Sequence, residues 1–162
     1  MTDRKPEAAG VTFREARREE TPAIVALILQ GDAARPLSLE QAEAEAVHPA
    51  YLAAFDAIAA SPDIALFVAE RAGVVIGTIK VVIVPGLAAR GRTRARFESV
   101  HVAPLLRGAG IGASIIAFAS DYARRRGATA LELTSHNERL DAHRFYLKLG
   151  FDQTHAGFRK SL

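Results

Sequence analysis

Three glycines lie close together in the segment 107–112, between a predicted strand and a predicted helix. Glycine lets the backbone turn tightly there, and the first amides of a helix have no carbonyl acceptor within the helix. These N–H donors and the positive end of the helix dipole form an anion site, for which a pyrophosphate is a natural ligand. A glycine-rich turn without a ligand is the alternative.

A dinucleotide is a second class of ligand for the same segment. Gly108, Gly110 and Ala113 match the loose dinucleotide-binding pattern G-x-G-x-x-A. That pattern opens a parallel βαβ unit that is followed by further βα units. Here it follows a predicted antiparallel hairpin, and only about fifty residues come after it. The context therefore disfavours a dinucleotide.

Hydrophobic periodicity and turn signals predict the elements that position this segment. Helices are expected to begin at Thr21, with Pro22 in its first turn, and at Ser38, where Gln41 completes a capping box. Pro49 interrupts the second helical region, and a further turn or two follows it. The order of elements predicts a single α/β sheet domain. The strands are expected over 11–16, 64–71, 74–84, 93–102, 130–134 and 151–158, and the later helices over 110–126 and 141–149.

Composition limits the classes of function. The 162 residues include no cysteine, which excludes disulfides and thiolate chemistry. The net charge of +3 is spread along the chain without the basic stripe of a nucleic-acid binder. We find no membrane-spanning run and no signal peptide, so we expect a cytoplasmic protein. Residues 1–10 are expected to form a flexible arm and residues 11–162 one domain.

Two sequence blocks carry a family resemblance. The segment 102–112 resembles the acetyl-CoA signature of the GNAT N-acetyltransferase superfamily, whose core is Arg or Gln, two residues, Gly, one residue, then Gly or Ala. The segment 142–151 resembles the second block of the family, at the family's spacing. Together with the element order, the resemblance covers about residues 11–160. The C-terminal part is similar to a subgroup that includes aminoalkylphosphonate N-acetyltransferases.

The resemblance implies a mixed, mostly antiparallel sheet flanked by helices, with two central strands splayed apart around acetyl-CoA. The pantetheine would pair with the backbone of the strand ending at Val102. The pyrophosphate would lie on the amides of 107–112. Asn137 stands near the asparagine position of the family, which is here Arg139. The residues implied in coenzyme binding are Val100, His101, Val102, Arg107, Gly108, Ala109, Gly110, Ile111, Gly112, Asn137, Arg139, His143 and Tyr146.

The same resemblance assigns the catalytic residues. Tyr146 occupies the position of the family's general acid, which protonates the departing thiolate. Glu98 is the candidate base for the incoming ammonium, and an N–H near Val100, where the family carries a bulge, is the candidate donor to the oxyanion. The alternatives are a tyrosine packed under the last helix and a glutamate held in a salt bridge.

Other polar residues permit more than one interpretation. Strict strand alternation points His101 away from Glu98, which favours a structural histidine with satisfied hydrogen bonds. Arg94 and Arg96 would favour an acceptor with a carboxylate, phosphate or phosphonate if they point into the pocket, although a solvated loop and strand face is the usual outcome for such a run. His136 and His143 either approach the coenzyme or face solvent. Five scattered histidines do not predict a metal site.

The chain is thus expected to be an acyltransferase that acetylates a primary amine of a small molecule by direct attack in a ternary complex. Acetyl-CoA is its expected co-substrate. A catalytically idle domain that senses acetyl-CoA and an enzyme that acetylates a protein or peptide amine are the alternatives. No nucleic acid, membrane or metal is expected as a partner, and a homodimer stays open because the sequence indicates no interface.

Overall fold

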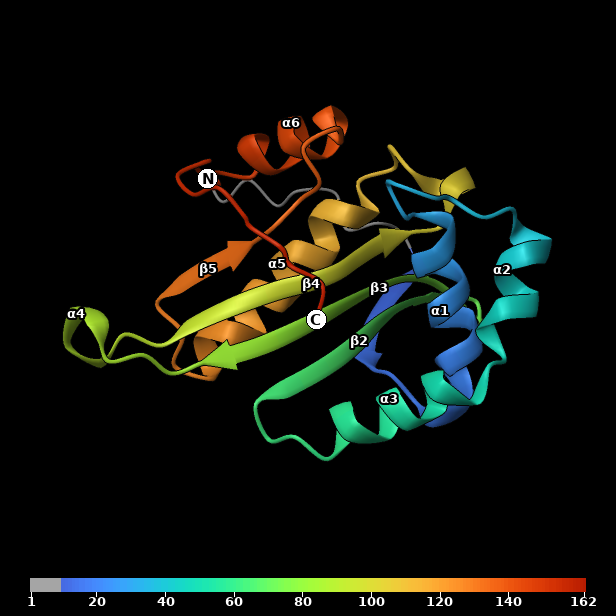
Figure 1. The fold of residues 1–162 in the computed structure, drawn as a ribbon, viewed down its shortest axis with the longest axis horizontal. Coiled ribbons are helices and arrows are strands. Elements are labelled where there is room, and N and C mark those ends of the chain that lie inside the picture. Colours follow the sequence, from blue (N-terminus) through green and yellow to red (C-terminus); the bar gives the residue numbers. More distant parts are fainter. Residues whose placement is uncertain (1–9) are drawn as a thin grey trace.

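The computed structural model describes residues 10–162, so nearly all of the expected arm lies outside the described residues. Within residues 10–162, five strands form a single mixed sheet, and helices lie on both of its faces (Figure 1). This architecture confirms the fold class expected from the sequence. The elements are β1 (Val11–Glu15), η1 (Arg18–Glu20), α1 (Thr21–Gln30), α2 (Leu39–Ala46), α3 (Pro49–Ala59), β2 (Ile64–Arg71), β3 (Val74–Val84), α4 (Ala88–Gly91), β4 (Arg94–Val102), η2 (Pro104–Leu106), α5 (Ile111–Arg125), β5 (Ala130–Leu133) and α6 (Leu140–Lys148).

The strands lie in the order β1-β2-β3-β4-β5. The first four are antiparallel to their neighbours, and β5 lies parallel to β4 after the crossover through α5. The predicted hairpin closes at Ala72-Gly73, where both residues have a positive φ, of 50° and 79°. Glycine adopts such an angle without strain, which favours Gly73 at the second position of this turn.

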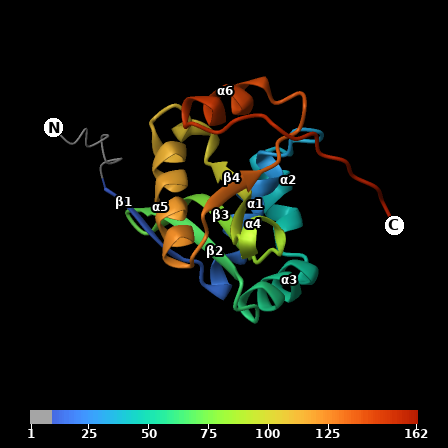
Figure 2. The same ribbon diagram turned by 90° about the vertical axis from the view of Figure 1, so that its left-hand side faces the viewer.

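The sheet separates two helical layers (Figure 2). Helix α5 packs on one face against β1, β3 and β4, whereas α1 and α3 cover part of the other face. The main core lies between the sheet and α5 and includes Phe97, Ile79 and Ile115, each at most 2% exposed. Burial of such large apolar side chains is the principal stabilising contribution to the fold, about 1.5–3 kcal/mol each.

Helix α2 packs on α1 through small residues, with Val25 and Ala26 against Ala42 and Ala46. The predicted capping box at the start of α2 is confirmed: the amide of Gln41 donates to Ser38 Oγ (3.2 Å), and the amide of Ser38 donates to Gln41 Oε1 (3.1 Å). These contacts fix the point at which the loop between α1 and α2 ends, and this loop stands beside the candidate site.

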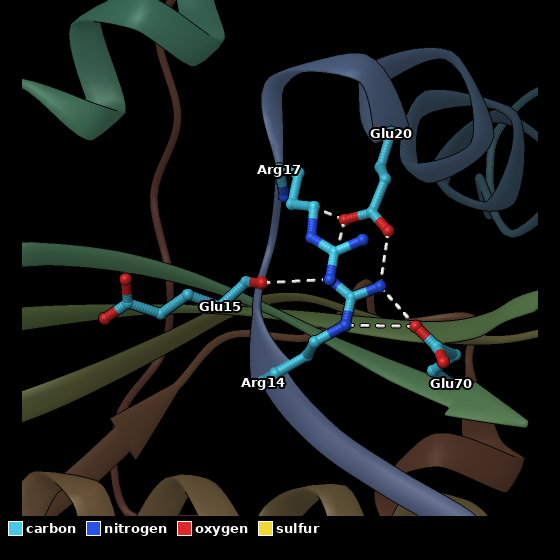
Figure 3. A network of polar contacts seen from close by, with 5 residues as sticks. All are labelled: Arg14, Glu15, Arg17, Glu20 and Glu70. Atoms are coloured by element: carbon cyan, nitrogen blue, oxygen red, sulfur yellow. Dashed lines mark hydrogen bonds and ion pairs between the residues drawn. The ribbon is translucent and has the colours of Figure 1, made fainter. Parts of the chain in front are cut away.

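Arg14 connects the start of α1 to the sheet (Figure 3). Its guanidinium on β1 donates to both carboxylate oxygens of Glu20 in η1, at 2.9 and 2.5 Å, and to the carboxylate of Glu70 on β2. The Glu20 carboxylate also accepts the amide of Arg17 at 2.7 Å. These charge-assisted hydrogen bonds fix the direction in which α1 leaves the sheet.

The expected final strand over 151–158 is wrong. The chain after α6 has no regular secondary structure, and Phe158 is 97% exposed. A strand exists only through hydrogen bonds to a neighbouring strand, and within the described chain this segment has none.

Helix α3 is longer than the turn or two expected after Pro49. No helix among residues 10–162 combines the length and apolar character needed to cross a membrane.

Candidate active site

Strands β4 and β5 pair only over their first residues. The parallel register runs from Arg94 opposite Ala130 to Phe97 opposite Leu133. Beyond Phe97, β4 continues to Val102 with no partner on that side among the described residues, and the two strands diverge (Figure 1). The expected splayed central strands are therefore present, and they leave a free strand edge over 98–102.

The glycine segment follows this free edge and leads into α5. Gly108 and Gly110 have φ of 82° and 81°, in the left-handed region that glycine adopts readily. Within the described chain, none of the amides from 108 to 113 donates to a protein acceptor, whereas the amide of Ser114 donates to Gly110 O. A row of free N–H donors at the N-terminus of a helix suits an anionic phosphate group.

Gly112 also has a structural role. A Cβ built there would lie 3.2 Å from Phe145 Cζ, so α6 approaches the first turn of α5 closely at this position. Tyr146 follows Phe145 in α6 and packs against the main core. The centroid of its ring lies 5.1 Å from that of Phe145 and 5.7 Å from that of Phe151. Burial raises the pKa of the Tyr146 phenol, against a smaller opposing effect of Arg139. The phenol therefore holds its proton at neutral pH.

A β-bulge interrupts β4 at Ser99. Ser99 has φ of 52°, and the register with β3 shifts between Glu98 opposite Lys80 and His101 opposite Thr78. The structure thus contains the bulge that the resemblance implies beside Val100. The extra residue alters the alternation of side chains, so that Glu98 and His101 lie on the same face of the sheet. The expectation that His101 points away from Glu98 is therefore wrong, because it assumed an unbroken strand.

The charged residues of this face form two groups of ion pairs. Lys80 Nζ lies 2.7 Å from Glu98 Oε2. Arg94 and Arg96 both bind Glu132 on β5, at 2.9 and 3.2 Å. The salt bridge expected as the alternative for Glu98 is present, and its partner is Lys80 on β3. The two arginines share one carboxylate, and this group carries a net positive charge.

His101 lies against the end of α1. A Cβ on Gly31 would be 2.1 Å from His101 Nδ1, so the imidazole occupies the space that any larger residue would fill. Burial lowers the pKa of His101 to about 4, and the charges of Arg139 and Arg107 contribute to this lowering. Asp32 has a smaller opposite effect. No hydrogen bond to the His101 ring is present in the described structure, which does not support a histidine with satisfied hydrogen bonds.

The remaining predicted residues lie around the splayed strands. Arg107 Nε donates to Val102 O at 3.2 Å, so Arg107 folds back on the end of β4. Arg139 is the residue that immediately precedes α6. His143 Nε2 donates to His136 O at 3.0 Å, and His136 Nδ1 accepts the amide of Glu138 at 3.3 Å. Both histidines therefore form hydrogen bonds with the backbone of the loop before α6 and stabilise it. Asn137 is exposed in this loop.

Sequence reasoning missed Gly31 and Asp32, which the packing of α1 brings beside His101. A glycine followed by aspartate after a helix indicates a turn, but no local signal shows which strand lies next to that turn.

No group of three potential metal ligands occurs within residues 10–162. A hollow of about 240 Å³ lies elsewhere, near the C-terminal end of α5, and Phe55, Tyr122 and Arg126 line it.

Comparison with known proteins identifies the family. Residues 32–151 match the model of the acetyltransferase (GNAT) family. The chain belongs to this family. It is 32% identical over 150 residues to an aminoalkylphosphonate N-acetyltransferase of Salmonella typhimurium, covering 93% of this chain and 90% of that protein.

Two solved structures extend this result. A transcriptional regulator from Bacillus halodurans superimposes with a TM-score of 0.83 at 30% identity, covering 94% of this chain and 99% of that one. An acetyltransferase from Trypanosoma brucei superimposes with a TM-score of 0.72 at 25% identity, with the same coverage of both chains. The chain is accordingly an acyltransferase whose co-substrate is acetyl-CoA. The free strand edge and the free amides fit that co-substrate.

Proposed function

We propose that this acetyltransferase transfers the acetyl group of acetyl-CoA to the primary amine of a small molecule by direct attack in a ternary complex. One observation carries the proposal: the free edge of β4 over 98–102 leads directly into the unpaired amides of 108–113. Such an arrangement suits a ligand that carries both an amide-containing arm and a pyrophosphate.

The coenzyme would be held mainly by backbone. Its arm would pair with the segment 100–102, and its pyrophosphate would accept hydrogen bonds from the amides of 108–112, since the amide of Arg107 already donates to Pro104 O. Arg107 and Arg139 stand around the splayed strands and would supply donors for its remaining oxygens, and Asn137 is a further donor at the edge of this site. His143 would act indirectly, because its N–H already holds the carbonyl of His136. When bound, the coenzyme supplies the thioester that the amine attacks.

Tyr146 is the proposed general acid. Protonating a leaving thiolate from a tyrosine of ordinary pKa is uphill by only about 2 kcal/mol. Burial raises the pKa of this phenol, which adds to that cost and keeps the phenol protonated until the thiolate forms. Glu98 is the proposed base for the incoming ammonium. The bulge at Ser99 leaves the neighbouring N–H of Val100 as the proposed donor to the oxyanion.

The acceptor is proposed to carry an acid group. Arg94 and Arg96 share the carboxylate of Glu132, so one positive charge is left without a matching anion on the face that also carries Glu98. The Salmonella relative is an aminoalkylphosphonate N-acetyltransferase, which agrees with an acid-bearing amine. Acetyl transfer to 2-aminoethylphosphonate and to propylamine, followed by thiol release, tests this point, and equal kcat/KM for both would contradict it.

The variant Tyr146→Phe tests the mechanism. We expect kcat to fall about tenfold to a thousandfold, while calorimetry gives an unchanged Kd for coenzyme A. Unchanged turnover would remove Tyr146 from the mechanism. Coenzyme binding without transfer to any amine of a broad panel would instead indicate an acetyl-CoA sensor. Absence of coenzyme binding would contradict the proposed function as a whole.

A further inference from the structure

Asp32 presents a fixed carboxylate beside the candidate site. Its Oδ1 accepts the backbone amides of Ala34 (2.8 Å) and Arg35 (3.0 Å), which orient the side chain in the loop after α1. These amides lower the pKa of Asp32, that of Arg35 most strongly, so the carboxylate is ionised at neutral pH. No basic side chain of the described chain lies within 4.0 Å of it, as the ion pairs in this part of the molecule involve other residues.

Its neighbour in space is a neutral imidazole. His101 lies on Gly31, which directly precedes Asp32. The low pKa of His101 keeps its ring uncharged across the neutral range, so it can accept a hydrogen bond without repelling a cation. The bulge at Ser99 turns this ring to the face that carries Glu98.

The surrounding charges single out Asp32. Of the three carboxylates Asp32, Glu98 and Glu132, the last two already bind basic side chains. The charges that influence the pKa of His101 are those of Arg107, Arg139 and Asp32, and those that influence the pKa of Asp32 are His101 and His136. In the proposed function the two arginines lie near the coenzyme phosphates, which would offset their positive charge. Asp32 then has no cation of its own.

We propose that Asp32 and His101 form the subsite that binds the ammonium group of the acceptor. The inference rests on the proposed function and adds the residues that recognise the amine. The charged carboxylate and the neutral imidazole are both acceptors, and an alkylammonium group carries three N–H donors to satisfy them. The subsite selects amines that are protonated in solution. Their proton must leave before attack, and Glu98 on the same face is the proposed acceptor of that proton.

A purely structural role for Asp32 predicts a different outcome. In Asp32→Asn the amide oxygen of the new side chain would still accept the two backbone amides of the turn, but the charge would be lost. In Asp32→Ala both the acceptor and the charge would be lost. The first variant therefore tests ammonium binding separately from the turn, and the second removes both together. Glu43→Gln, on the exposed face of α2, is the matched control for loss of one surface carboxylate.

The kinetic experiment compares propylamine, which is a cation at neutral pH, with methoxyamine, which is uncharged. For Asp32→Asn we expect the KM of propylamine to rise about threefold to tenfold at low salt, with kcat within about twofold of the wild type. The increase should shrink at high salt. The KM of methoxyamine and the Kd of coenzyme A should not change. An unchanged KM of propylamine in Asp32→Asn, with impairment only in Asp32→Ala, would overturn the proposal.

A binding experiment is independent of turnover. With coenzyme A bound, titration with propylamine should shift the imidazole resonances of His101 in the wild type and in Glu43→Gln, and shift them much less in Asp32→Asn. Absence of any shift in the wild type, with coenzyme binding intact, would overturn the subsite while leaving the proposed function standing. Loss of coenzyme binding would contradict the proposed function itself. The propylamine titration repeated without coenzyme A would then test the subsite separately.

Discussion

Replacing Gly31 with alanine moves His101 without straining the backbone. Gly31 has φ of −96° and ψ of 2°, in the bridge region, which is sparsely populated but sterically allowed for alanine. The new methyl group would nevertheless lie 2.1 Å from His101 Nδ1 and 2.7 Å from Cε1. Atoms in comfortable contact are about 3.5 Å apart or more. The imidazole must therefore retreat by roughly 1.4 Å, the shortfall from that contact distance, which it achieves by changing its side-chain torsions.

The expected effect on stability is small. A displaced side-chain torsion costs about 0.5–1.5 kcal/mol, and replacing glycine with alanine at compatible backbone angles stabilises by about 0.4–1 kcal/mol through the unfolded chain. The two contributions nearly cancel, so we expect the free energy of unfolding to stay within about 1 kcal/mol of the wild type. For a chain of this size, Tm should then change by no more than about 4 °C.

The expected effect on the site is large by comparison. Displacement of the ring from its buried position should raise the pKa of His101 from about 4 toward the ordinary value of 6.5. Following the imidazole resonances of Gly31→Ala across pH measures this directly, and the KM of propylamine should rise alongside. Gly73→Ala is the contrasting control, since φ there is 79° and nothing lies within 4 Å of the new Cβ. It should lower stability by about 1 kcal/mol and leave His101 unchanged.

The outcome for Gly31→Ala can refute the reasoning in two ways. A His101 titration that matches the wild type would show that the ring does not lie on Gly31 in solution. A loss of several kcal/mol in the free energy of unfolding would show that α1 moves instead of the ring. In the background of His101→Ala, the same substitution should have no effect on the KM of propylamine, which isolates the contact between the two residues.

Two further perturbations test the electrostatics of the fold. The pKa of His101 is about 4 in the folded state and 6.5 in the unfolded chain, so the unfolded state binds more protons between these pH values. The contribution of His101 to the free energy of unfolding is therefore complete above pH 6.5 and should fall by about 3 kcal/mol as the pH is lowered to 4. Urea unfolding across this pH range measures the loss, which should be absent in His101→Asn. Arg14→Met leaves Glu20 and Glu70 half-buried without their cation, so we expect a loss of about 2 kcal/mol at pH 7 by urea unfolding. Since Arg14 lowers the pKa of Glu20, the difference from the wild type should shrink as the pH falls below 4.5, and a difference independent of pH would contradict this account.

Local patterns in the sequence were sufficient for most of the fold and for the glycine segment that leads into α5. The capping box at Ser38, the turn at Ala72-Gly73 and the glycines of 108–112 each depend on residues a few positions apart, so their physical causes can be read without knowing the tertiary structure. The expected strand over 151–158 failed for the opposite reason, because a strand requires a partner and the segment has none in the described chain.

The residues of the proposed acceptor subsite became visible only in the tertiary structure. The direction of His101 depends on the bulge at Ser99, which is defined by pairing with β3, and periodicity along β4 alone gives the opposite face. Gly31 and His101 are far apart in the sequence and come into contact only because α1 packs on that face of the sheet. Backbone hydrogen bonding and turn chemistry are local, whereas the contact between a helix end and a strand face arises from the packing of the whole domain. The sequence by itself thus determined the glycine segment and the free amides that suit acetyl-CoA, and the packing of α1 determined which side chains stand beside them.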